Sequence, residues 1–62
     1  MKLEIGQKIL YDGSLIQGRG LNRVGKATII QSIPDGITIE FVADGSRIWL
    51  PSEVIPFRIK EL

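Results

Sequence analysis

Hydrophobic and polar residues alternate in several short runs of this chain, which is the pattern of strands that bury one face. The clearest run is 37–41, Ile-Thr-Ile-Glu-Phe, in which every second side chain is apolar. Four further runs carry a similar alternation and predict strands at 5–11, 26–33, 46–50 and 56–60. The pattern therefore predicts five short strands and no long helix.

The same alternation divides each predicted strand into an inward and an outward face, since residues two apart on a strand share a face. Arg47 and Trp49 point outward when their neighbours Ile48 and Leu50 point inward. The alternative is a Trp49 ring that packs under a loop, shielded by the stem of Arg47. The side chains that we expect in the core are Ile5, Ile9, Tyr11, Ala27, Ile29, Ile33, Ile37, Ile39, Phe41, Ile48, Leu50, Val54, Phe57 and Ile59.

Turn signals separate these runs. Asp-Gly pairs begin at Asp12, Asp35 and Asp44, and Asp-Gly between apolar runs favours a hairpin because glycine accepts a positive φ. Residues 13–25 include four glycines and predict a long loop, a kind of segment that is often functional. Pro-Ser-Glu-Val at 51–54 predicts one turn of 3-10 helix before the last strand, with its serine as a cap.

Five short strands, a long early loop and a one-turn 3-10 helix describe an all-β, five-stranded SH3-like small barrel. Residues 5–9 resemble the Gly-Asp-x-Val opening of KOW and Tudor-like barrels, with Gln7 where aspartate is usual. Residues 20–30 are similar to the KOW core, and residues 39–57 resemble the second half of Tudor-like domains. The resemblance implies a binding role rather than a particular partner.

Composition supports this class and excludes several others. With 62 residues there is room for one domain, 1–62, and eleven isoleucines against two alanines favour strands over helices. The chain has no Cys and no His, which removes disulfides, thiolate metal sites and the usual general base. We therefore expect no enzyme activity, no catalytic residue, no cofactor and no metal site.

The apolar runs are too short for a membrane span, and the first residues lack the apolar region of a secretory signal. We therefore expect a soluble, cytoplasmic protein.

Charge is small overall, at +1, but it is unevenly distributed. Residues 13–34 carry three bases and no acid, a charge of +3, whereas residues 35–53 carry four acids and one base, a charge of −3. The pI of 8.1 is below the value of about 9 that is typical of nucleic-acid-binding domains. The bases of the first segment can contact acidic groups or phosphates, or they can serve only as a solvated loop that keeps a small domain soluble.

These features predict a non-enzymatic docking module for a protein or nucleoprotein partner. The contact surface that we predict combines a basic loop with an outward strand face and consists of Arg19, Arg23, Lys26, Arg47 and Trp49. One alternative is a single-stranded RNA- or DNA-binding barrel that uses the same residues. A second is a small structural subunit, or a homo-oligomer, joined through apolar residues without an inward position: Leu3, Leu10, Leu15, Ile16, Leu21, Ile30, Val42 and Ile55.

Overall fold

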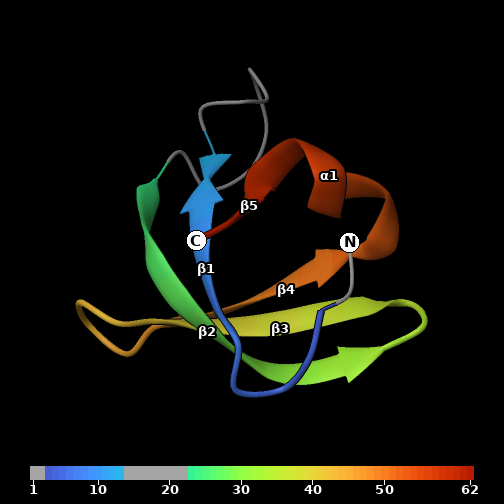
Figure 1. Cartoon of the computed structure of the whole chain (residues 1–62), viewed down its shortest axis with the longest axis horizontal. Helices are drawn as coiled ribbons and strands as arrows, with labels where there is room; N and C mark the ends of the chain where they lie inside the picture. Colours follow the sequence, from blue (N-terminus) through green and yellow to red (C-terminus); the bar gives the residue numbers. More distant parts are fainter. Residues whose placement is uncertain (1–2, 14–22) are drawn as a thin grey trace.

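The computed structural model describes residues 3–13 and 23–62, whose backbone forms one antiparallel sheet (Figure 1). Its five strands lie in the spatial order β4-β3-β2-β1-β5. Their bounds are Lys8–Asp12 for β1, Val24–Ile33 for β2, Gly36–Phe41 for β3, Arg47–Pro51 for β4 and Ile59–Glu61 for β5. The predicted all-β class is confirmed, and each predicted strand overlaps one observed strand.

The longest strand, β2, joins two parts of this sheet. It pairs with β1 through Val24 to Thr28 and with β3 through Ala27 to Ile33. The register with β3 shifts between Ile29 and Gln31, which leaves the residue between them as a bulge. A bulge bends a strand and increases its twist, and β2 curves between β1 and β5 on one side and β3 and β4 on the other (Figure 1). Within the described residues no pairing joins β4 to β5, so the sheet stays open.

The bulge corrects one core prediction. The alternation placed Ile33 on the inward face with Ala27 and Ile29, but Ile33 is 44% exposed. One extra residue reverses the alternation for the rest of the strand. Ile33 therefore lies opposite Gly36 on the outer face of the sheet.

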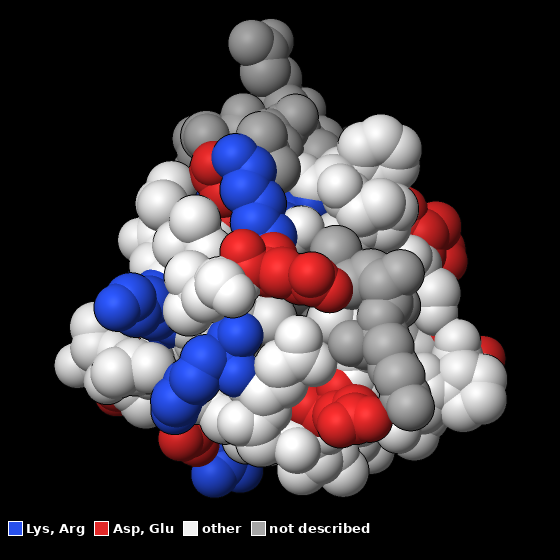
Figure 2. Space-filling view, in the orientation of Figure 1, with Lys and Arg blue, Asp and Glu red and all other residues white. Residues whose placement is uncertain are grey.

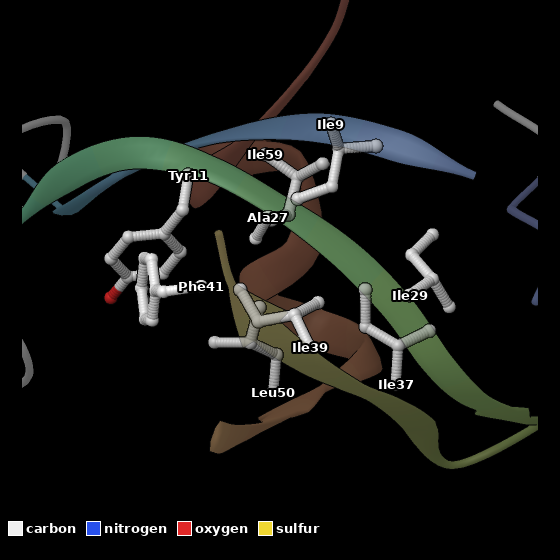
Figure 3. Close-up of a cluster of buried hydrophobic side chains, with 9 residues drawn as sticks. All are labelled: Ile9, Tyr11, Ala27, Ile29, Ile37, Ile39, Phe41, Leu50 and Ile59. Atoms are coloured by element: carbon white, nitrogen blue, oxygen red, sulfur yellow. The ribbon is translucent and has the colours of Figure 1, made fainter. Parts of the chain in front are cut away.

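The core fills the space between the two parts of the bent sheet (Figure 3). Tyr11 and Phe41 meet edge to face at one end, with ring centroids 5.4 Å apart. Full burial of such a side chain contributes about 1.5–3 kcal/mol. The buried hydrophobic side chains are Ile9, Tyr11, Ala27, Ile29, Ile37, Ile39, Phe41, Leu50 and Ile59, all of them predicted, and Leu3, Ile48, Val54 and Ile55 pack partly buried against them.

Turns connect β2 to β3 and β3 to β4 at or next to two of the three predicted Asp-Gly pairs. Pro34 and Asp35 form the two-residue turn between β2 and β3, and Gly45, with a φ of 73°, lies in the turn between β3 and β4. At the end of β1 the N–H of Gly13 donates to the Arg23 carbonyl at 2.9 Å. The predicted long loop falls largely on residues 14–22, which lie outside the described residues.

The first predicted strand begins later than expected, which corrects the placement of Ile5. The N–H of Gln7 donates to the Glu4 carbonyl at 3.1 Å, and Gly6 between them has a φ of 91°. This turn delays the strand to Lys8 and leaves Ile5 69% exposed. The pattern missed the turn because Ile5 has the same parity as the inward residues of β1.

The last predicted strand is also shorter than expected. The predicted 3-10 turn is present as η2 (Ser52–Val54), but one turn of α-helix, α1 (Ile55–Arg58), follows it before β5. Pro56 fits the first turn of a helix, where a backbone N–H has no helical partner. The predicted inward position of Phe57 is therefore wrong: its side chain lies on α1 and is 57% exposed.

Candidate functional site

The predicted surface residues of β4 do point outward. Arg47 and Trp49 lie on the face opposite Leu50, and their cross-strand neighbours on β3 are Glu40 and Thr38. We call the side chains of Thr38, Glu40, Arg47 and Trp49 the outer face of β3 and β4. Trp49 is 45% exposed, so the indole presents a large apolar surface to solvent from a strand that is paired with β3.

Arg47 is paired with an acid rather than free on this face. Its Nε donates to Oε2 of Glu40 at 2.9 Å, and the side chains are 66% and 37% exposed. Exposed pairs of this kind contribute about 0–1 kcal/mol to stability. The pair instead offsets the positive charge beside Trp49.

The indole of Trp49 packs over a glycine. A Cβ added to Gly36 would lie 2.9 Å from Cζ2 of Trp49 and would collide with the carbonyl oxygen of Leu50. Gly36 is itself buried, because the Trp49 ring covers the space that a side chain would occupy. The ring is thus held from below, while no described residue accepts a hydrogen bond from its Nε1–H. An exposed aromatic ring that keeps an unused donor is suited to contact a partner.

Beside the indole lies an open pocket of about 510 Å³, which we call the Trp49 pocket. Two hydrogen bonds hold its rim: the Ser52 N–H donates to the Asp35 carbonyl at 2.8 Å, and the Ser52 hydroxyl donates to the Pro34 carbonyl at 2.7 Å. These bonds tie the β2–β3 turn to the start of η2. They also correct the predicted role of Ser52, since its hydroxyl makes no helix cap. The pocket is lined by Pro34, Asp35, Trp49, Pro51, Ser52 and Glu53.

Arg23 contacts the other end of the β3–β4 hairpin through several interactions. Its guanidinium donates to both carboxylate oxygens of Asp44 at 3.0 Å and to the Ser46 hydroxyl at 2.9 Å. The same group lies 3.9 Å from the centroid of the Phe41 ring, a distance typical of a cation–π contact. We call Arg23, Phe41, Asp44 and Ser46 the Arg23 clasp.

The clasp holds the pKa of Asp44 well below its ordinary range. The hydrogen bond from Arg23 is the largest cause, followed by the bonds from the backbone N–H and the hydroxyl of Ser46. Each favours the charged carboxylate. The Arg23 guanidinium thus closes the end of the core above Phe41 while its charge is balanced by an acid 21 positions away.

The described structure places four of the five predicted contact residues, and they lie on more than one element. Arg23 belongs to the clasp, Arg47 and Trp49 share β4, and Lys26 is exposed on β2 opposite Leu10. Arg19 lies outside the described residues. On the face seen in Figure 2, basic and acidic side chains are interspersed and form no field of one sign.

Sequence reasoning missed the acids of the Trp49 pocket. The sequence pattern predicts Asp35 only as a turn residue and Glu53 only as part of a helical turn. The available signal was the charge of −3 over residues 35–53. This segment begins in the turn before β3 and ends in the helical turn after β4. The pairing of β3 with β4 brings the turn before β3 next to the helical turn after β4. Neither segment alone predicts this contact.

Among the described residues, no cluster of three or more acidic side chains could hold a metal ion, and no helix is long and apolar enough to cross a membrane. Comparisons with protein-family models, curated proteins and solved structures find no match to this chain.

Proposed function

We propose that this chain is a non-enzymatic docking module with an SH3-like barrel architecture, and that it binds a protein partner on the outer face of β3 and β4. The strand order β4-β3-β2-β1-β5, the curved β2 and the 3-10 turn that follows β4 support this architecture. Trp49 is the anchor of the surface. The observation that carries the proposal is the exposed indole packed over Gly36 beside a pocket.

Binding energy in protein interfaces concentrates in a few residues, among which tryptophan is enriched. Such an anchor costs little entropy to bury when its position is already fixed. Gly36 below the ring and the two hydrogen bonds from Ser52 at the rim provide this fixed position. Ile33, 44% exposed on the same face of the sheet, extends the apolar surface toward the β2–β3 turn.

The geometry favours a protein over a nucleic acid as the partner. Nucleic-acid affinity comes chiefly from lysine and arginine on phosphates. Of the predicted cations, Arg23 and Arg47 already pair with Asp44 and Glu40. A phosphate would have to displace these carboxylates, and both acids would then repel it.

The test is affinity capture from native lysate, with and without nuclease, using the wild-type chain, Trp49→Ala and Val24→Ala. Val24 is a matched control because it is also apolar and exposed, at 58%, but lies at the start of β2. We expect a protein that nuclease does not release, that Val24→Ala retains and that Trp49→Ala loses. Because Trp49 is the single tryptophan, the purified partner must also change the intrinsic fluorescence. Retention by Trp49→Ala, or release by nuclease, contradicts the proposal.

A further inference from the structure

The walls of the Trp49 pocket are poor in hydrogen-bond donors. Pro34 and Pro51 carry no backbone N–H. The N–H and the hydroxyl of Ser52 are both used inside the chain, on the carbonyls of Asp35 and Pro34. The side chains that remain for a ligand are two carboxylates, an aromatic face and one indole N–H.

The charge of the pocket has one sign. Asp35 and Glu53 are exposed, and no base is among the residues that line the pocket. Arg47 lies two residues from Trp49 on the outer face, but its guanidinium is held by Glu40. The local charge that faces a ligand at the pocket is therefore negative.

An aromatic face beside carboxylates is complementary to a cation with several donors. A guanidinium is planar, stacks on an indole and donates two parallel hydrogen bonds to a carboxylate. Apolar residues on either side of such a cation would meet the proline walls and Ile33. Resting on the docking function proposed above, we propose that the Trp49 pocket binds an extended segment of a protein partner that carries an arginine between apolar residues.

The probe is the peptide acetyl-Ala-Leu-Arg-Leu-Ala-amide, compared with the same peptide carrying citrulline or glutamate in place of arginine. Citrulline has nearly the shape of arginine without its charge. Binding is followed by the indole N–H resonance of Trp49, which is a single peak because the chain has one tryptophan. We expect the arginine peptide to shift this resonance, the citrulline peptide to bind about two- to fivefold more weakly, and the glutamate peptide to leave it unchanged.

The variants Asp35→Asn and Glu53→Gln each remove one charge with little change of shape. We expect each to weaken the arginine peptide about two- to fivefold, and we expect added salt to weaken it in the wild type. Glu61→Gln is the matched control, because Glu61 is an exposed acid on β5, at the opposite edge of the sheet. It should bind the peptide like the wild type.

Three results overturn this inference: equal binding of the arginine, citrulline and glutamate peptides, no shift with any peptide, or equal weakening by Glu61→Gln. A shift of the indole resonance by oligouridylate but not by the arginine peptide also overturns it and points to nucleic acid. If the peptides fail while a lysate protein is still lost on Trp49→Ala, the docking function stands and only the basic partner chemistry is rejected.

Discussion

The two ends of the β3–β4 hairpin use charge in opposite ways. At the Arg23 clasp a cation, an acid, a hydroxyl and an aromatic ring satisfy one another, and the Arg23 side chain is only 28% exposed. At the Trp49 pocket the hydrogen bonds of Ser52 hold the rim, and two acids and an indole face solvent. The comparison separates charges that pair with one another from charges that face solvent beside the indole. It also shows that two bases of the predicted contact surface, Arg23 and Arg47, are already paired with acids.

The largest change in the free energy of unfolding that we expect comes from a substitution at Gly36, the residue beneath the indole. Gly36→Ala should lower the free energy of unfolding by about 2–3 kcal/mol, because the new methyl group meets a backbone oxygen and the Trp49 ring. Gly45→Ala is the control: its φ of 73° is strained for alanine, but nothing lies within 4 Å of the added atom. It should cost only about 1 kcal/mol. Urea unfolding checks both, and equal costs would contradict the close approach of Leu50 and Trp49 to Gly36.

The next effect compares the two arginine–carboxylate pairs. Arg23→Gln should lower the free energy of unfolding by about 1 kcal/mol, since it removes the contact over Phe41 along with the ion pair. Arg47→Gln should change it by less than about 0.5 kcal/mol, because that pair is exposed and has no ring beneath it. Thermal or urea unfolding of the two variants side by side decides the matter. An Arg47→Gln variant that loses as much as Arg23→Gln would erase the difference between the two ends.

Acid should destabilise the clasp. The pKa of Asp44 is lower in the folded chain than its ordinary value of 3.8, so the folded state holds fewer protons than the unfolded state in that range. The stabilising contribution is complete above the ordinary value and is lost as the pH falls below it toward the depressed folded value. Asp44→Asn should therefore flatten the loss of stability below about pH 4, whereas Arg47→Gln should preserve it. Unfolding measured between pH 2 and pH 6 checks this, and an unchanged acid slope in Asp44→Asn would contradict it.

Much of the fold follows from local patterns in the sequence. Ile37, Ile39 and Phe41 alternate without interruption, and their strand and burial are as predicted. The errors arise where an extra residue or a short turn shifts the alternation of inward and outward side chains. The bulge after Ile29 turns Ile33 outward, and its one sign in the sequence is the polar Gln31 at a predicted inward position. The residues before Ile59 are compatible with one helical turn as well as with the start of a strand. The hydrophobic pattern therefore does not determine the position of Phe57.

The site was predictable only in part. The strand period favours the outward position of Trp49, but only its exposed fraction of 45% decides against a ring packed under a loop. The partner of Arg23 does not, since Asp44 is 21 positions away and is reached only when β2 and β3 pair. The acids beside Trp49 likewise depend on the tertiary pairing that brings Asp35 and Glu53 to one pocket. The pattern of residues along the chain does not show which strands pair or in which register.

The most direct test of the central claim is a map of backbone amide shifts during titration with the arginine peptide. We predict that the shifted amides cluster around Asp35, Trp49 and Glu53, together with the indole N–H, while the amides of Arg23, Asp44 and Ser46 stay in place. Shifts centred on the Arg23 clasp, or spread evenly over both ends of the hairpin, would contradict the assignment of the Trp49 pocket as the contact surface.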